Sequence, residues 1–306
     1  MKIGVVGCGA IGSIFAAHLG RLDDVDVFAM DVWEDHVKAI NRTGLRISGA
    51  ANFTVKIKAT TNPADVPRCD YGIVATKSLH TKAAIERAAH LFDEKSAVCS
   101  VQNGVGNEEI LAEHVRCVIR GTTFPAGHVI EPGHVSYDIS GDTWIGPFEP
   151  TNTPMKMVEE LAATLTRSGL NTIAMRDARG AQWTKLIFNA ATNPVGALTR
   201  LNHGAAAFFQ PTGELFDALI DEGVAVSRAH GIELPDDPKQ MVKTAAHAPG
   251  THKASMLQDI LAGRPTEVDF MNGAIVQWGE KAGVPTPLNK ALWALVKGLE
   301  HSWTNP

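Results

Sequence analysis

Residues 2–20 read KIGVVGCGAIGSIFAAHLG, and this stretch decides the fold of the first half of the chain. A short apolar run leads into Gly7-Cys8-Gly9-Ala10-Ile11-Gly12, which matches the pattern G-x-G-x-x-G, and a second apolar run follows. The order predicts a strand, a tight turn and a buried helix. Gly7 permits the turn, Gly9 lets a pyrophosphate approach the backbone, and Gly12 lets the helix lie close to the strand. Free N–H groups at the helix start then favour phosphate oxygens, so the motif predicts a dinucleotide site.

A glycine motif alone is weak evidence, but an acidic residue supports it here. VDVFAM at 25–30 reads as the next strand, and Asp31 follows it, about 20 residues beyond the motif, where a carboxylate can hold the ribose hydroxyls of a dinucleotide. Such a carboxylate favours NAD and repels the 2′-phosphate of NADP. The alternative is that Asp31 caps the helix expected in DVWEDHVKAI, and both roles can coexist.

The rest of this half alternates strands with helices. YGIVATK at 71–77 and AVCSVQNG at 97–104 read as buried strands, each followed by a helix, at about 79–92 and 107–114. The alternation predicts a doubly wound parallel sheet of the Rossmann type, with ligands beyond the carboxyl ends of its strands. Lys77 and Asn103 stand at two such ends; Asn103 either binds the cofactor or is a turn residue before glycine. The remaining expected elements are a pair of edge strands in GLRISG (44–49) and FTVKIKATT (53–61), antiparallel strands completing the sheet in 117–148, a helix at 153–168 and a strand at 171–175.

Bulk composition excludes several protein classes. The 306 residues suffice for two domains, and a net charge of −5 without a basic run gives little support for binding nucleic acid or a membrane surface. The four cysteines are scattered, which suits a reducing compartment. No apolar run approaches the roughly 20 residues of a membrane helix, and the first residues read as a core strand rather than a signal peptide, so we expect a cytoplasmic protein. The 12 histidines show no metal-ligand spacing, and we expect no metal.

Beyond Met175 the strand pattern stops, which predicts a domain of residues 1–176 and an all-helical domain of residues 177–306. Within AQWTKLIFNAATNPVGALTRL (181–201), Lys185, Asn189 and Asn193 recur every four residues and share one helix face. A polar stripe on an otherwise apolar helix is costly to bury without partners. The alternative is a solvent-facing stripe on a surface helix. Pro194 should kink or end this helix.

Glu267 opens the last informative segment. THKASMLQDILAG (251–263) reads as a helix ended by Gly263, and TEVDFMNGAIVQWGEKAG (266–283) as the next helix, with Thr266 as its N-cap. A glutamate in a first helical turn is favoured by the helix dipole alone, so Glu267 has an ordinary explanation beside a catalytic one. A C-terminal helix is expected over 288–303, with these side chains inward: Leu292, Leu295, Val296 and Leu299.

Taken together, GCGAIG, Lys77, QNG at 102–104, KLIFNAATNP at 185–194 and SMLQDILAGRPTEVDFMNG at 255–273 resemble the ketopantoate reductase (2-dehydropantoate 2-reductase) family over almost the whole chain. The resemblance implies hydride transfer between a nicotinamide cofactor and the keto carbon of a 2-oxo acid. It implies catalytic roles for Lys185 and Glu267 and a place for Lys77 near the adenosine phosphate. The other implied site residues are Asn189, Asn193 and Ser255 for the substrate and Asn103 for the cofactor.

One departure from the family pattern concerns the cofactor. The family usually has a basic residue at the end of the second strand and uses NADP, whereas this chain has Asp31 there. We therefore expect a preference for NAD, which keeps open an NAD-dependent D-2-hydroxyacid dehydrogenase of the D-mandelate type on the same fold. A dinucleotide-binding sensor without catalysis is a second alternative. The sequence does not specify the side chain of the acid, and it leaves open a homodimer.

Overall fold

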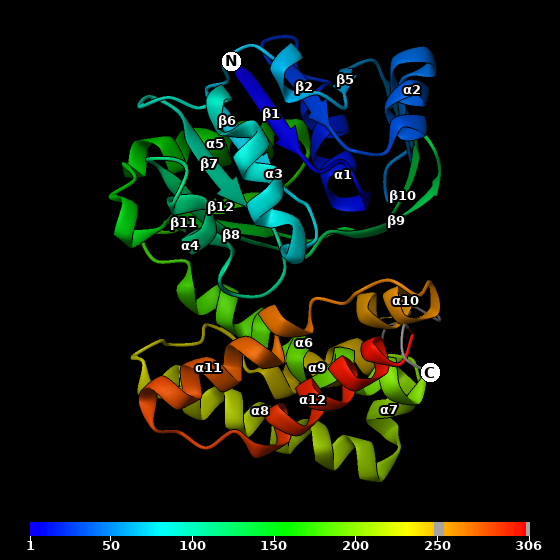
Figure 1. Ribbon diagram of the computed structural model, residues 1–306, viewed down its shortest axis with the longest axis vertical. Coiled ribbons are helices and arrows are strands. Elements are labelled where there is room, and N and C mark those ends of the chain that lie inside the picture. Colours follow the sequence, from blue (N-terminus) through cyan, green and yellow to red (C-terminus); the bar gives the residue numbers. More distant parts are fainter. Residues whose placement is uncertain (248–253, 304–306) are drawn as a thin grey trace. The chain divides into compact units, whose positions relative to one another are not determined.

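The computed structural model describes residues 1–247 and 254–303 (Figure 1). Its contacts divide the chain into two compact units. Unit 1 comprises Met1–Gln102 and Asn107–Ala178, and unit 2 comprises Asn103–Gly106 and Arg179–Pro306. The chain therefore enters unit 2 twice, first for the short segment 103–106 and again after Ala178.

Unit 1 is built on an eight-stranded sheet with the strand order β12-β11-β8-β7-β6-β1-β2-β5. From β5 through β8 all neighbouring strands are parallel, and β11 runs antiparallel to β8. This sheet confirms the predicted α/β Rossmann-type architecture. Its strands are β1 (Lys2–Val6), β2 (Asp26–Met30), β5 (Lys58–Thr60), β6 (Tyr71–Val74), β7 (Ala97–Ser100), β8 (Val118–Thr123), β11 (Thr143–Pro147) and β12 (Thr172–Ala174).

A second sheet corrects two predictions of strand pairing. Its order is β4-β3-β10-β9, from β3 (Leu45–Gly49), β4 (Phe53–Val55), β9 (Ala126–Glu131) and β10 (His134–Ile139). The predicted strand 53–61 is thus two strands in different sheets, and only β8 and β11 of the region 117–148 join the main sheet. Side-chain alternation identifies a strand but not its partner, because the partner is chosen by packing between distant segments.

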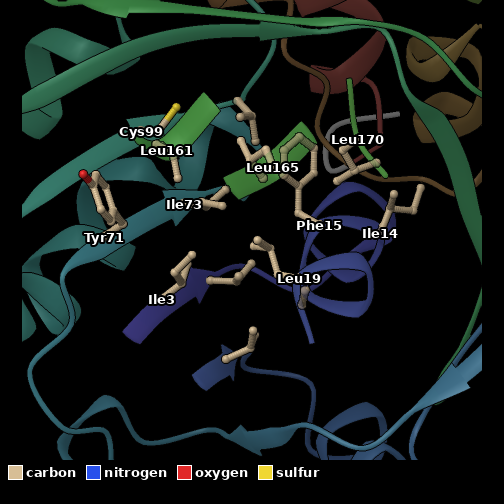
Figure 2. Close-up of a cluster of buried hydrophobic side chains, with 14 of the residues drawn as sticks. Ile3, Ile14, Phe15, Leu19, Tyr71, Ile73, Cys99, Leu161, Leu165 and Leu170 are labelled. Atoms are coloured by element: carbon tan, nitrogen blue, oxygen red, sulfur yellow. The ribbon is translucent and has the colours of Figure 1, made fainter. Parts of the chain in front are cut away.

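Helices cover the main sheet and bury its apolar side chains. They are α1 (Ala10–Leu19), α2 (Glu34–Thr43), α3 (Thr81–Ala88), α4 (Asn107–Ala112) and α5 (Met155–Ser168). Figure 2 shows Phe15 of α1 and Leu161 and Leu165 of α5 gathered with Ile3 of β1 and Ile73 of β6, and all five are fully buried. Burying one such side chain stabilises the fold by about 1.5–3 kcal/mol. The helix expected at 79–92 is shorter, because 3₁₀ turns at Ser78–His80 and Ala89–Leu91 flank α3.

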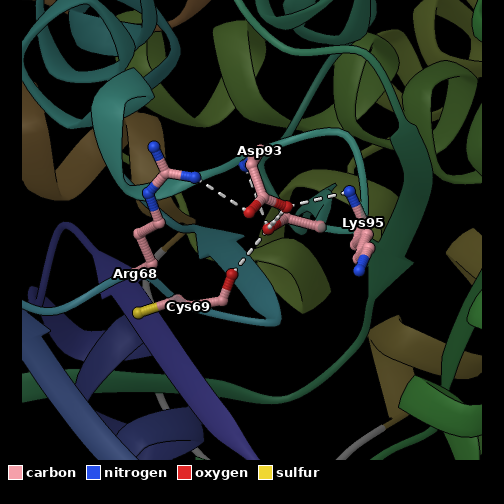
Figure 3. Close-up of polar contacts among 5 residues, drawn as sticks. Arg68, Cys69, Asp93 and Lys95 are labelled. Atoms are coloured by element: carbon pink, nitrogen blue, oxygen red, sulfur yellow. Dashed lines mark hydrogen bonds and ion pairs between the residues drawn. The ribbon is translucent and has the colours of Figure 1, made fainter.

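A polar cluster fixes the amino ends of β6 and β7 (Figure 3). The carboxylate of Asp93 accepts hydrogen bonds from the Arg68 guanidinium (3.0 Å) and from the Lys95 backbone N–H (2.9 Å). The Ser96 hydroxyl donates to the Cys69 carbonyl (2.7 Å). The backbone N–H of Lys95, followed by Arg68, lowers the pKa of Asp93. The two loops that precede these strands are therefore tied together at the edge opposite the glycine motif.

Apart from the segment 103–106, unit 2 is built from helices over its described residues. Its elements are α6 (Arg179–Thr199), α7 (His203–Phe208), α8 (Gln210–Ala229), α9 (Pro238–His247), α10 (Ser255–Leu261), a 3₁₀ turn η5 (Val268–Phe270), α11 (Asn272–Ala282) and α12 (Pro287–His301). The long helix α6 packs against α8, α10 and α12. Trp183, Ile187, Phe216 and Val296 are buried among these helices. Within the described ranges, none of the helices combines the length and apolarity needed to cross a membrane.

Three helix predictions need correction. Pro194 does not end α6, which continues to Thr199. The helix expected from Thr266 is interrupted at Met271: η5 comes first, and α11 begins at Asn272. Leu295 is 57% exposed, whereas Leu292 and Val296 are buried, because the packed face follows the i, i+4 stripe and Leu295 lies to its side. The start of the helix expected over 251–263 falls at 251–253, outside the described residues, and α10 begins at Ser255.

Candidate active site

The glycine motif lies at the carboxyl edge of the main sheet, where its geometry requires two of its glycines. Val6 of β1 is in register with Met30 of β2, and the Gly7 N–H donates to the Met30 carbonyl (2.8 Å). Gly7 has φ +87°, and a Cβ there would lie 2.4 Å from the Thr76 methyl group. A Cβ on Gly12 would lie 1.9 Å from the Gly7 carbonyl oxygen. A side chain at either position would therefore disrupt the turn.

Gly9 differs from these two glycines. It is the N-cap of α1. Within residues 1–247 and 254–303, no side chain makes a capping hydrogen bond to this helix, and a Cβ on Gly9 would meet no atom within 4 Å. Ala10 and Ile11, the first residues of α1, are half-buried. The helix start thus presents backbone N–H groups without a covering side chain, which fits the pyrophosphate of a dinucleotide.

Asp31 follows β2 directly beside this turn. Its carboxylate accepts a hydrogen bond from the backbone N–H of Trp33 (2.9 Å), and its own N–H donates to the Thr60 carbonyl (3.2 Å). The N-cap of α2 is Trp33, so Asp31 holds the turn before the helix rather than capping it. The carboxylate is thereby fixed at the end of β2, which is the position expected for a ribose ligand.

A buried histidine that the sequence analysis missed supports the glycine motif. The Gly133 N–H donates to His36 Nδ1 (3.0 Å), so the neutral ring carries its proton on Nε2 and donates to the Ser13 hydroxyl (3.2 Å). Ser13 in turn donates to the Cys8 carbonyl (2.8 Å). Burial lowers the pKa of His36, and the Asp31 carboxylate opposes that shift. No spacing rule pointed to His36, since its hydrogen-bond partners, Ser13 and Gly133, come from two distant segments.

Lys77 and Gln102 follow β6 and β7 at the same edge. Lys77 is half-buried and precedes the 3₁₀ turn at Ser78. The Gln102 amide donates to the Thr76 carbonyl (3.0 Å) and to the Thr81 hydroxyl (2.7 Å). Gln102 thus braces the turn after β6, which carries Lys77.

In unit 2, the polar stripe of α6 is buried rather than solvent-facing. Asn193 is 3% exposed, Asn189 is also buried, and Lys185 is half-buried. The Asn193 amide lies 3.8 Å from the Met271 sulfur. The surface-helix alternative is therefore wrong, and the stripe needs an explanation other than solvation.

Glu267 lies beside this stripe. It is 4% exposed, and its carboxylate accepts a hydrogen bond from the Asn103 amide (3.3 Å). Burial lowers the pKa of Lys185 to about 8, while the nearby Glu267 carboxylate acts to raise it. Because α11 starts only at Asn272, the dipole of that helix does not account for Glu267. Unit 2 therefore brings Lys185, Glu267 and Asn103 together.

Asn103 reaches Glu267 because the segment 103–106 is bonded to unit 2. The Val105 N–H donates to the Phe270 carbonyl (3.0 Å), and the Gln182 amide donates to the Gly104 carbonyl (3.3 Å). Gly104 has φ +86°, and a Cβ there would lie 2.3 Å from the Phe270 carbonyl oxygen. Backbone conformation and close packing therefore both require glycine after Asn103.

Ser255 is the first residue of α10, which packs along α6. Its side chain is half-buried. Thus Asn189, Asn193 and Ser255 lie on two packed helices of unit 2, whereas Asp31 and Lys77 belong to unit 1. Among residues 1–247 and 254–303, no three His, Cys, Asp or Glu side chains are grouped so as to hold a metal ion.

Comparison with known proteins gives the same family for both parts of the chain. The family described as "Ketopantoate reductase PanE/ApbA" matches residues 3–150, and "Ketopantoate reductase PanE/ApbA C terminal" matches residues 177–300. The chain is 35% identical over 302 residues to a 2-dehydropantoate 2-reductase of Pyrococcus horikoshii, covering 98% of each chain. It is 34% identical over 299 residues to that of Archaeoglobus fulgidus, again covering 98% of each.

Solved structures agree with this assignment. A ketopantoate reductase family protein of Ralstonia eutropha superposes with a TM-score of 0.89 at 30% identity, covering 100% of both chains. D-mandelate dehydrogenase in complex with NADH and anilino(oxo)acetate superposes with a TM-score of 0.90 at 26% identity, covering 99% of both. The chain therefore belongs to the ketopantoate reductase family of NAD(P)-dependent oxidoreductases, which act on 2-oxo acids.

Proposed function

We propose that this chain reduces 2-dehydropantoate (ketopantoate) with a nicotinamide cofactor. The observation that carries the proposal is the cluster in unit 2 in which the Asn103 amide lies 3.3 Å from the buried carboxylate of Glu267, close to Lys185, whose pKa is lowered by burial to about 8. A lysine tuned toward neutral pH suits proton transfer to a carbonyl oxygen. Full-length similarity to 2-dehydropantoate 2-reductases of two archaea supports the substrate class.

The residues of unit 1 fit a dinucleotide. Gly7, Gly9, Ala10, Ile11 and Gly12 would hold its pyrophosphate through the N–H groups at the start of α1. Asp31 would accept hydrogen bonds from the ribose hydroxyls, and Lys77 would lie toward the adenosine phosphate. The nicotinamide group, when bound, supplies the hydride.

The residues of unit 2 would bind the acid and supply the proton. In its ammonium form, Lys185 stabilises negative charge on the keto oxygen and donates the proton that completes the hydroxyl group. Glu267 accepts a hydrogen bond from a substrate hydroxyl and favours the charged form of Lys185. Asn103 orients the carboxylate of Glu267. Asn189, Asn193 and Ser255 would bind the substrate carboxylate and its polar groups.

Asp31 supports NAD rather than NADP as the preferred cofactor. The carboxylate is held at the end of β2 by the Trp33 N–H, so it has little freedom to withdraw from a 2′-phosphate. The same residue favours a second candidate function, an NAD-dependent D-2-hydroxyacid dehydrogenase. The similarity to a D-mandelate dehydrogenase that was solved with NADH agrees with this candidate.

The test is a steady-state assay of the purified protein with ketopantoate and a panel of aliphatic and aromatic 2-oxo acids, each with NADH and NADPH. We expect turnover of ketopantoate, with NADH preferred. Turnover confined to aromatic 2-oxo acids with NADH would identify the dehydrogenase instead. If a folded protein that binds NADH reduces none of the acids, the proposal fails; Lys185→Met, checked for folding and NADH affinity, is the matched inactive control.

A further inference from the structure

Helix α6 contains a proline, yet it continues past it. Pro194 has no N–H, so the Ala190 carbonyl, four residues earlier, lacks its helical donor. Ala190 is fully buried. A buried carbonyl without a donor destabilises the fold, so its bonding must be accounted for.

The missing donor comes from α11. The side-chain amide of Asn272 donates to the Ala190 carbonyl (2.8 Å) and to Asn289 Oδ1 (3.0 Å). Asn272 is fully buried, and its own Oδ1 has no hydrogen-bond partner among the residues that the structure describes. The opposite amide orientation would place Oδ1 against two acceptors, so the network selects the orientation that serves Ala190 and leaves Oδ1 unbonded.

Asn289 and Glu222 hold that orientation in place. The Asn289 amide donates to Glu222 (2.8 Å) and to the Leu219 carbonyl (3.3 Å), so Asn289 presents its oxygen to Asn272. The backbone N–H groups of Leu288 and Asn289 also donate to the Glu222 carboxylate (2.8 and 2.9 Å). The chain of bonds thus runs from α8 through the first turn of α12 and α11 to the middle of α6.

We propose that Asn272 is a positioning residue that couples the Lys185 helix to the Glu267 segment, with Pro194 as the device that makes the coupling necessary. Asn272 begins α11, the helix that follows Glu267 and η5. Ala190 is the residue after Asn189, which belongs to the polar stripe of α6. An N–H at position 194 would satisfy the Ala190 carbonyl within α6. Proline removes that option, so the carbonyl is satisfied by α11, and the Asn272 amide helps to fix the spacing between Lys185 and Glu267.

The test is a double-mutant cycle of Asn272→Leu and Pro194→Ala. Leucine is close to asparagine in size but cannot donate, whereas alanine at 194 restores the helical N–H. Loss of the bond to Asn289 occurs in both backgrounds and cancels in the cycle. We expect N272L to lower kcat about 10- to 100-fold and the melting temperature by several degrees, with P194A within about twofold of the parent. The double variant should recover the part of both losses that comes from the Ala190 carbonyl, and the part that comes from Asn289 should remain.

The pKa of Lys185 gives a readout that needs no turnover. The pH dependence of Lys185 acetylation by acetic anhydride, followed by mass spectrometry, should give an apparent pKa of about 8 in the parent and in P194A. The apparent pKa of Lys185 should shift in N272L and return toward the parent value in the double variant. Additive losses, with neither kcat, melting temperature nor this pKa restored by P194A, would overturn the coupling. If N272L fails to fold, recovery of folded protein by P194A supports the proposal, and failure to recover it counts against it.

The catalytic part of this inference rests on the proposed function, and the two fail separately. A parent protein that is inactive on all the 2-oxo acids but shows the rescue in stability and acetylation would reject the substrate and retain the coupling. An active parent protein in which P194A does not rescue N272L would retain the proposed function and reject the coupling.

Discussion

The side-chain amide of Asn103 lies 3.3 Å from a carboxylate oxygen of Glu267, although 164 residues separate them in the sequence. Asn103 begins the segment 103–106, which follows β7 and belongs to unit 2, and Glu267 precedes η5 in the same unit. Their contact places a residue expected on the cofactor side of the reaction against a residue expected to be catalytic.

Replacing Asn103 tests whether this contact orients Glu267. Asn103→Ala should remove about 1–2 kcal/mol of transition-state stabilisation and so lower kcat, because the carboxylate loses a hydrogen-bond donor. Asn103→Asp should be worse than alanine, since two carboxylates at this distance repel. Single-turnover rates at saturating NADH would measure both; equal activity of the two variants would contradict an orienting role.

The pH dependence of reduction reports on Lys185. In the proposed mechanism the ammonium form of Lys185 is the active one, so kcat/KM for the 2-oxo acid should fall as pH rises through about 8. Glu267 raises the pKa of Lys185, hence Glu267→Gln should move this fall to lower pH. Lys185→Arg keeps the positive charge but does not titrate in this range. Its activity should be lower by about 10²–10⁴-fold, and its kcat/KM should not fall at alkaline pH. An unshifted profile in E267Q would contradict the electrostatic link.

Cofactor choice should depend on the charge of Asp31. Asp31→Asn keeps an oxygen for the Trp33 N–H but removes the negative charge. Repulsion in water is about 1 kcal/mol per pair of unit charges at 4 Å, and a 2′-phosphate carries a charge of about −1.5 to −2. Removing the Asp31 charge should therefore raise the ratio of kcat/KM for NADPH over NADH roughly 10- to 30-fold. The ratio is measured at fixed ionic strength, with the melting temperature as the folding control. An unchanged ratio would remove the argument for NAD.

The glycine motif offers a matched pair of substitutions. The methyl group of Gly9→Ala meets no atom of the described residues within 4 Å, so the melting temperature should stay unchanged. NADH binding should weaken, because the new methyl group covers the start of α1. Gly12→Ala would place a Cβ 1.9 Å from the Gly7 carbonyl and should lower the melting temperature markedly. Calorimetry of unfolding and of NADH binding separates the two. Loss of stability in G9A would show that Gly9 serves the fold and not the ligand.

Local signals predicted the parts of the molecule that are local in the chain. The turn at Gly7–Gly12, the strand ending before Asp31 and the buried stripe of α6 all follow from spacing within one or two elements. Pairing between distant segments did not follow: β9 and β10 join β3 rather than the main sheet. The interruption at Met271 was also missed, because the backbone leaves the helical conformation there (φ −108°, ψ −94°) at a residue type that does not break helices. Likewise, the partners of His36 and Asn272 come from remote segments.

The segment 103–106 limits how the two units can be separated or exchanged. A cut after Ala178 yields a C-terminal fragment without the backbone that bonds Phe270 and Gln182, and without the amide that bonds Glu267. The N-terminal fragment would keep those four residues as a loop without their partners. Recombination between two relatives at residue 178 alone would therefore combine the segment 103–106 of one parent with its bonding partners, Gln182, Glu267 and Phe270, from the other. To transfer unit 2 intact, a recombinant needs the crossover after Ala178 and two more, one at each end of the segment 103–106.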